Sequence, residues 1–405
     1  MIIYGNRFCS SIVPALYDTR SVLLSLFILS DPQPLHNQPD PIQINTPDSR
    51  KPRNSFPALH RYDNSPSHPE MSQTANQFEL SGPPEDVISS LTFSPNNPSR
   101  LLVSSWDKNV YLYDTNAGLN GSKLTAFPHA ASVLDCCFGE TDGNVFSAGL
   151  DWQVQQLDSE TGKGNTLATH EGAVKSMCYN TETKSLLSGS WDQSIKQIDP
   201  RSPESTSSHA QPHKIFSLST ISHILVVAMS SRSVYLYDLR NMSSPWQRRE
   251  SSLKFMTRTV RCMPNAQGYA SSSIEGRVAV EFFDPSDGSQ KRKYAFKCHR
   301  STEGGVDVIY PVNALAFHPI YGTFASGGGD GVVSLWDGMA KRRLKQYQRY
   351  PASIAGLSFS NNGKYLAIGT SSGFEDGSDD GACPPESVKI IVRELQEGEG
   401  KGKGQ

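Results

Sequence analysis

A short β-hairpin pattern recurs along this chain and constrains its fold more than any other feature. The clearest copy runs from Leu186 to Asp199, where two short strands flank a tight turn with small residues before it and Asp192 at its corner. Three further copies carry an Asp at the same corner, namely Asp107, Asp151 and Asp330. An internal repeat of this kind predicts an architecture of similar units stacked side by side, because one hairpin cannot bury its own apolar face.

The length of the repeat identifies the unit. Each copy closes on an aromatic or aliphatic residue followed by Asp, at intervals of 39 to 53 residues. The closing pairs are Tyr113-Asp114, Leu157-Asp158, Ile198-Asp199, Tyr237-Asp238, Phe283-Asp284 and Trp336-Asp337. This spacing is typical of the four-stranded blade of a WD-repeat propeller. A seventh unit without a closing Asp follows, with strands predicted at 354–359, 365–369 and 388–392. We therefore predict an all-β fold, a seven-bladed WD-repeat β-propeller spanning residues 78–394.

The ends of the chain differ from the repeats. The segment 78–80 is predicted to supply the outer strand of the last blade, which would close the ring and remove its exposed edges. Residues 1–70 are rich in Pro, Asn, Ser and Asp after position 30, a composition typical of disorder. The apolar run at 21–30 is too short to span a membrane, so no membrane partner is expected. We interpret 1–70 as a disordered extension or an error of gene prediction, with Met71 as the natural start, and 395–405 as a flexible tail.

A His, Ser and Asp trio occurs inside two of the repeats. His170, Ser188 and Asp192 fall where WD repeats place a buried hydrogen-bonded set, and His129, Ser147 and Asp151 fall likewise one repeat earlier. A catalytic triad is the alternative interpretation. The trio recurs at fixed offsets, however, and no G-x-S-x-G motif accompanies it. We therefore predict a structural role for these residues and for the corner residues Asp107 and Asp330, and no enzymatic activity.

Composition narrows the remaining function classes. The seven cysteines form no CxxC pair and no metal-ligand spacing with His, so neither a metal nor a cofactor is expected. The net charge of −2 argues against a general nucleic-acid-binding surface, and no direct nucleic-acid partner is expected.

Two groups of residues are candidates for partner binding. Trp106, Trp191 and Arg232 lie in the tight turns, which all project to one face of a propeller, and we expect both tryptophans to be exposed. Packing of each Trp against a neighbouring loop is the alternative. Arg258 and Arg277, with Lys254 included by proximity, come from neighbouring strands and turns of one blade and could together bind carboxylate or phosphate. A solvated surface with no ligand is the alternative.

At these residues the chain resembles a known family. The matching strings are QRRESSLKF, SSIEGRVAVEFFDP, KYAFKCHR, YPVNALAFHP and PPEDVISSLTFSP. They are similar to the small propeller members of the mitotic-checkpoint family named "budding uninhibited by benzimidazole", from about Phe78 to Val392. SIEGRVA and FKCHR are also shared with a cousin, the WD-repeat factor of messenger-RNA export.

The resemblance implies a non-enzymatic adaptor of the spindle assembly checkpoint, resident in the nucleus, at kinetochores and also in the cytoplasm. The implied partners are GLEBS motifs of checkpoint kinases and pseudokinases, phosphorylated Met-Glu-Leu-Thr repeats of the kinetochore scaffold, and the mitotic checkpoint complex. Trp106 and Trp191 match the family's tryptophans on one face, and Arg232 matches an arginine associated with the acidic GLEBS partner. Arg258 and Arg277 match the pair expected to meet the phosphothreonine. KFMTR stands where KYQTR is usual, which affects Phe255 and Met256 beside Arg258. The alternative function is messenger-RNA export through a nucleoporin GLEBS motif.

Overall fold

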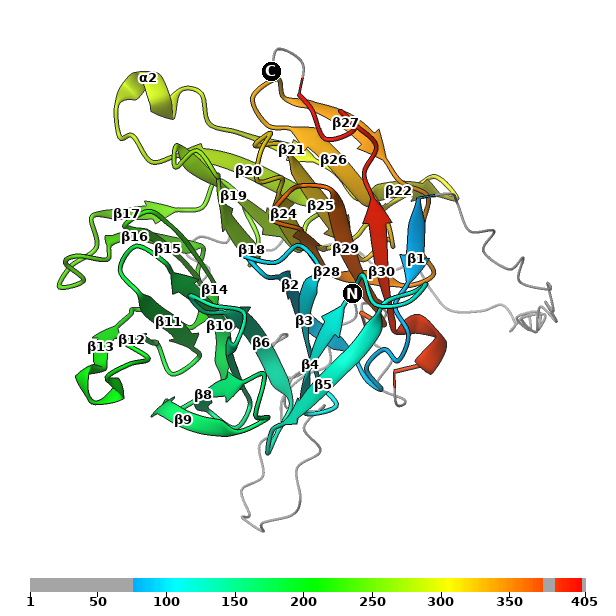
Figure 1. Cartoon of the computed structure of the whole chain (residues 1–405). Helices are drawn as coiled ribbons and strands as arrows, with labels where there is room; N and C mark the ends of the chain where they lie inside the picture. Colours follow the sequence, from blue (N-terminus) through cyan, green and yellow to red (C-terminus); the bar gives the residue numbers. More distant parts are fainter. Residues whose placement is uncertain (1–75, 374–382, 403–405) are drawn as a thin grey trace, which may run out of the picture.

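Seven four-stranded antiparallel sheets surround a central axis (Figure 1). The computed structural model describes residues 76–373 and 383–402, and all statements below refer to these residues. The predicted seven-bladed β-propeller is therefore confirmed. The interpretations of residues 1–70 and of Met71 fall outside the described residues.

Each blade runs from an inner strand at the axis to an outer strand at the rim. The strands of blades one to three are β2 Ile88–Phe93, β3 Arg100–Ser105, β4 Asn109–Asp114, β5 Ser122–Pro128, β6 Val133–Phe138, β7 Asn144–Gly149, β8 Gln153–Asp158, β9 Gly164–Thr169, β10 Val174–Asn180, β11 Ser185–Ser190, β12 Ser194–Ile198 and β13 Ser207–Ala210. Those of blades four and five are β14 Ile215–Ile221, β15 Ile224–Met229, β16 Ser233–Asp238, β17 Gln247–Glu250, β18 Thr257–Cys262, β19 Gly268–Ser273, β20 Arg277–Phe282 and β21 Tyr294–Lys297. Blades six and seven contain β24 Val312–Phe317, β25 Phe324–Gly328, β26 Val333–Asp337, β27 Arg342–Gln346, β28 Ser353–Phe359, β29 Tyr365–Ser371, β30 Lys389–Glu394 and β1 Gln77–Glu79.

The first strand of the chain closes the ring. β1 pairs antiparallel with β30, with Phe78 opposite Val392, so the start of the propeller completes its last blade. The Lys389 Nζ also lies 2.9 Å from the Glu79 Oε2 across the same pair of strands. The predicted closure by residues 78–80 is confirmed, because the strand near the start of the described chain pairs with the edge of β30 that would otherwise be unpaired.

Apolar side chains between neighbouring blades hold the ring together. The buried residues form one cluster at each of the seven junctions between blades, including the junction of blades seven and one. This pattern explains the sequence of the second strand of each blade. Leu101–Val103 and Leu225–Met229, for example, are buried without interruption because both faces of these strands lie against another blade.

The link between blades five and six contains an insertion, which lengthens the repeat interval seen in the sequence. A hairpin of β22 Arg300–Glu303 and β23 Val306–Ile309 lies between β21 and β24, and the four-residue helix α2 Asp287–Gln290 precedes β21. These additions account for the longest interval between closing Asp residues. The remaining helical turns are the 3₁₀ segments Pro203–Ser205 and Pro385–Ser387. In the described part of the chain no helix is long and apolar enough to cross a membrane.

Residues 395–402 differ from the flexible tail expected at 395–405, whose last three residues lie outside the described part of the chain. Thr323 donates a hydrogen bond to the Gly400 carbonyl at 2.6 Å, and the Glu399 carboxylate accepts one from Tyr347 at 2.7 Å. Lys345 Nζ lies 3.0 Å from Glu399, whose side chain is almost fully buried. Residues 395–402 are therefore packed against blade six. Composition suggested a free Gly-rich tail because it gives no weight to the single buried carboxylate that anchors the segment.

Candidate partner-binding face

All six candidate partner-binding residues lie at the same end of the propeller. We call this end the upper face and define it as the end where the second and third strands of each blade are joined. Trp106, Trp191 and Arg232 lie in these turns, of blades one, three and four. Lys254 lies in the link before β18, Arg258 is the second residue of β18, and Arg277 is the first residue of β20. The strand alternation and turn spacing thus place the two candidate groups on one surface.

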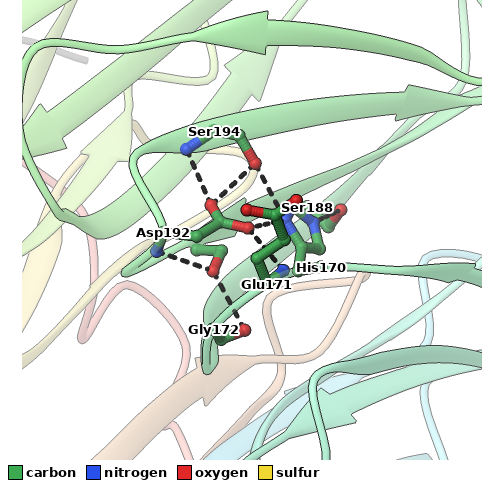
Figure 2. A network of polar contacts seen from close by, with 7 residues as sticks. His170, Glu171, Gly172, Ser188, Asp192 and Ser194 are labelled. Carbon is green, nitrogen blue, oxygen red and sulfur yellow. Dashed lines mark hydrogen bonds and ion pairs between the residues drawn. The ribbon is translucent and has the colours of Figure 1, made fainter.

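The upper end of blade three contains a closed network of polar side chains (Figure 2). His170 lies with Nδ1 3.0 Å from the Asp192 Oδ2 and Nε2 2.9 Å from the Ser188 Oγ. Asp192 also accepts hydrogen bonds from the backbone N–H of Glu171 and from the N–H and hydroxyl of Ser194, at 2.7 to 2.9 Å. Every polar atom of this network thus meets a partner from its own blade, as buried polar groups require.

The protonation states follow from this environment. Burial lowers the pKa of His170, against the opposing effect of the Asp192 carboxylate. Burial would by itself raise the pKa of Asp192, but hydrogen bonds from Ser194, Glu171 and His170 outweigh it, so that this pKa is lowered. At neutral pH a neutral imidazole therefore donates from Nδ1 to an ionised carboxylate and accepts at Nε2 from the hydroxyl of Ser188.

The same network occurs in two other blades. In blade two, His129 lies 2.9 Å from Asp151 and 2.7 Å from Ser147. In blade six, His299 lies 2.9 Å from Asp330 and 2.8 Å from Ser326, whose hydroxyl also accepts from the Trp336 Nε1 at 2.8 Å. His299 was not recognised from the sequence, because it precedes its Asp by 31 residues instead of 22. The hairpin β22–β23 accounts for the difference, so an insertion after an aligned His is the signal that could have revealed it.

Asp107 plays the corresponding part in blade one without a histidine. Its carboxylate accepts from the Tyr111 hydroxyl at 2.8 Å and from the backbone N–H groups of Glu85 and Asn109 at 2.9 and 3.0 Å. The Asp therefore fixes the turn in all four blades, whether its partner is an imidazole or a phenol.

This geometry does not suit nucleophilic catalysis. Ser188 is fully buried and His170 nearly so, which means that a substrate carbonyl could not reach the hydroxyl. In the part of the chain that the structure describes, no group of three or more His, Cys, Asp or Glu side chains is arranged to hold a metal ion.

Trp106 and Trp191 are less exposed than expected. Both are partly buried and pack, with Leu150, against the buried side chains of Leu134 and Ala173. The turn Trp that is exposed is Trp152, at 49%. The expectation of two exposed tryptophans was therefore wrong, since the turns of neighbouring blades lie close enough to cover much of each ring. The two tryptophans belong to one apolar cluster that extends over blades one to three.

Arg232 is engaged within the chain. Its Nε and Nη2 donate to the carbonyl oxygens of Leu253 and Ser251 at 2.9 and 3.2 Å, and its Nη1 lies 3.0 Å from the Glu250 Oε1. The guanidinium therefore holds the link between blades four and five, which continues directly into Lys254. Sequence reasoning placed Arg232 on the correct face but could not show this contact.

The upper end of blade five gathers cations from three of its strands. Thr257, beside Arg258, pairs with Ser273, which pairs with Arg277, and Arg277 in turn pairs with Lys297. The four backbone positions therefore form one row across the blade, with neighbouring strands about 4.8 Å apart.

Glu275 organises this row. Its carboxylate accepts the backbone N–H of Lys254 at 3.0 Å and lies 3.3 Å from the Arg277 Nε. The Lys254 side chain is exposed. Arg258 is directed toward blade six, where its Nε and Nη2 donate to the Asn313 Oδ1 at 3.1 and 2.8 Å. The structure thus places Arg258 and Arg277 at one end of one blade, with their guanidinium groups on different partners.

Comparisons with known proteins agree with this architecture. The family described as "WD domain, G-beta repeat" matches residues 75–114, 163–199 and 291–337. The chain is 52% identical over 330 residues to the mitotic checkpoint protein BUB3.1 of Arabidopsis thaliana, covering 80% of this chain and 94% of the relative. It is 44% identical to the mitotic checkpoint protein bub3 of Dictyostelium discoideum, with coverages of 78% and 95%.

The chain belongs to the BUB3 family. Members of this family are non-enzymatic WD-repeat adaptors of the mitotic checkpoint, and this chain is a homologue of the spindle assembly checkpoint protein. A more distant relative is the mRNA export factor GLE2 of Chaetomium thermophilum, 34% identical, with coverages of 75% and 86%. Among solved structures, that of U3-55K is similar at a TM-score of 0.66 and 18% identity, covering 80% of this chain and 99% of that one, which shows the shared propeller fold alone.

Proposed function

We propose that this BUB3-family chain acts at kinetochores by binding two kinds of peptide on its upper face. The first is a phosphorylated Met-Glu-Leu-Thr repeat of the kinetochore scaffold, bound at the upper end of blade five. The second is a GLEBS segment of a checkpoint kinase or pseudokinase, which lies across Trp106 and Trp191. The chain would thereby bring its kinase partners and the mitotic checkpoint complex to the kinetochore.

The row of cations on blade five is the observation that carries this proposal. Arg277 and Lys297 are paired positions on neighbouring strands, Arg258 is the second residue of the inner strand of the same blade, and Lys254 is exposed near them. Glu275 is the carboxylate that lies among them. A phosphate group complements such an excess of positive charge, because guanidinium groups bind its oxygens through paired, charge-assisted hydrogen bonds.

The surroundings of this row suit a peptide rather than a free phosphate. Phe255 and Ile274 are exposed at 52% and 39%, and the Ile274 N–H donates to the Met256 carbonyl at 3.2 Å. Apolar peptide side chains next to the phosphothreonine could therefore cover them. Since Phe255 and Met256 stand where the family usually has Tyr and Gln, we expect this contact to be more apolar than in relatives.

Calorimetric titration of the full chain tests the proposal. One Met-Glu-Leu-Thr peptide is added in phosphorylated and unmodified forms, with and without a GLEBS peptide. We expect binding of the phosphorylated form only, strengthened by the GLEBS peptide. Equal affinity for both forms would contradict the proposal. If RNA then bound with a strong dependence on salt, a role in messenger-RNA export would be favoured, as the names of the more distant relatives state for them.

A further inference from the structure

The central channel of the propeller contains a small cavity lined by charged side chains. The inner strands of all seven blades surround the axis (Figure 1), and the cavity between them has a volume of about 70 Å³. Lys175 of β10, both Arg258 and Arg261 of β18, and Asp135 of the neighbouring strand β6 line it. Three cations from two blades therefore share this space with one carboxylate.

The carboxylate is already engaged with the backbone. Asp135 accepts the N–H of Met177 at 2.7 Å through one oxygen and the N–H of Cys136 at 3.0 Å through the other. Arg261 donates from Nη1 to the Thr259 hydroxyl at 3.1 Å and to the Val260 carbonyl at 2.9 Å, both neutral acceptors. The single carboxylate can offset only one of the three positive charges that line the channel, and the acceptors of Arg261 carry no charge.

Lys175 is the least satisfied of the three cations. Among residues 76–373 and 383–402, none forms a hydrogen bond or an ion pair with its ammonium group. Burial lowers its pKa, the nearby Arg258 and Arg261 lower it further, and Asp135 opposes them. Lys175 is partly buried, and a cation that two others repel has an environment that an anion would improve.

We propose that the channel binds one small tetrahedral oxyanion, of the size and charge of phosphate, between Lys175, Arg258 and Arg261. A cavity of about 70 Å³ is several times smaller than the pockets that hold drug-sized ligands, so a small anion fits it better than a nucleotide does. An oxyanion offers an acceptor to each cation at once. The site shares Arg258 with the phosphopeptide site but does not rest on the proposed function, because Lys175 and Arg261 belong to the channel alone.

Inorganic phosphate and the full chain provide the test. Phosphate is titrated at constant ionic strength against a chloride buffer, and binding is followed by calorimetry and by the thermal unfolding midpoint. We expect saturable binding with a rise in Tm, since a ligand that binds only the folded state stabilises it. Lys175→Met should weaken binding at least about ten-fold, which corresponds to roughly 1.4 kcal/mol. Lys163→Met, in an exposed loop, is the matched control and should bind as the wild type does.

Two outcomes would overturn the channel site. One is the absence of saturable phosphate binding by the wild type, and the other is wild-type affinity in Lys175→Met. Should that variant fold poorly, crystals of the unaltered protein soaked in tungstate give a second measurement. Anomalous signal between Lys175 and Arg261 supports the site, whereas signal only on surface lysines contradicts it.

Two further titrations distinguish phosphate from a carboxylate as the channel ligand, and the channel site from the blade-five site. If acetate binds more tightly than phosphate, the channel accepts a carboxylate side chain and the assignment to phosphate is wrong. Arg277→Ala should lose phosphopeptide binding and retain phosphate in the channel. If it loses both, the phosphate was bound on blade five and the channel proposal fails. If it retains both, the channel proposal stands and the proposed peptide site fails.

Discussion

The upper ends of blades three and five each contain a carboxylate among polar groups, but its partners differ in number and charge. In blade three, Asp192 meets His170, Ser194 and a backbone N–H, and His170 meets Ser188, so the polar groups satisfy one another inside the blade. In blade five, Glu275 lies among several cations, and Lys254 projects into solvent. One end is closed by its own hydrogen bonds, and the other retains an excess of positive charge.

This difference separates structural polar residues from binding residues. A buried polar group with a full set of internal partners stabilises a turn, and its loss costs folding free energy. An exposed cation without a matching carboxylate adds little to folding, but it is available to an anionic partner. Neither burial nor charge alone makes the distinction, because Arg232 is charged and half-exposed yet serves the chain itself.

The largest expected effect is on phosphopeptide binding at blade five. Arg258→Ala combined with Arg277→Ala should weaken binding by about 2–4 kcal/mol, because charge-assisted hydrogen bonds contribute about 1.5–3 kcal/mol each and are not additive. Calorimetry measures the affinity. The matched control combines Arg201→Ala with Arg240→Ala, which removes two exposed arginines from the opposite face. Wild-type affinity in the blade-five variant would contradict the role of Arg258 and Arg277 in phosphopeptide binding.

Blade three should respond in stability instead. Asp192→Ala leaves His170, Ser194 and the Glu171 N–H without their common acceptor, and we expect a loss of about 2–3 kcal/mol in the free energy of unfolding. Urea unfolding followed by circular dichroism measures it. Asp158→Ala, an exposed Asp at the opposite end of blade two, should change stability far less. A stable Asp192→Ala variant with impaired peptide binding would reverse the roles given to the two blades.

A variant of Arg232 tests whether this residue is structural or binds a partner. Arg232 has a φ of 59°, so Arg232→Asn removes the guanidinium and retains a residue that tolerates this conformation. We expect a loss of about 1–2 kcal/mol in stability and faster hydrogen exchange over 251–256, because the contacts to Ser251 and Leu253 disappear. Unchanged exchange with weaker binding of a GLEBS peptide would instead make Arg232 a direct partner contact.

Much of this architecture could be predicted because each blade repeats one pattern. The spacing of the closing Asp residues identified six blades, the strand pattern after Asp337 identified the seventh, and the offset of His170 from Asp192 predicted their contact. The contact of His299 with Asp330 was not predicted, because an inserted hairpin changed that offset. The proximity of the channel residues Lys175 and Arg261 was not predicted for a different reason. They come from blades that are distant in sequence, and only the closed ring brings them to one cavity.

The contacts of individual long side chains could not be predicted. The sequence placed Trp191 and Arg232 in turns on the upper face, but the exposure of a ring or the partner of a guanidinium depends on the neighbouring turn. Trp191 packs in one apolar cluster with Leu134 and Leu150 of blade two, and Arg232 contacts the link after its own blade. Glu399 likewise shows that one buried carboxylate can fix a segment whose composition is typical of a flexible tail.

The smallest expected effect concerns pH and again separates the two blades. Burial lowers the pKa of His170 below its usual value near 6.5, so the unfolded chain takes up a proton at a higher pH than the folded chain does. Stability should therefore be complete above that value and fall as pH drops toward the folded pKa, by at most about 1.4 kcal/mol per pH unit for one histidine. His170→Gln should reduce this slope in urea unfolding between neutral pH and about pH 5.5. Part of the slope should remain, because burial also lowers the pKa values of His209 and His318. The arginines of blade five stay charged throughout this range. Arg258→Ala with Arg277→Ala should therefore leave the pH slope of stability unchanged. If this variant changed the slope as much as His170→Gln does, the two regions would be coupled.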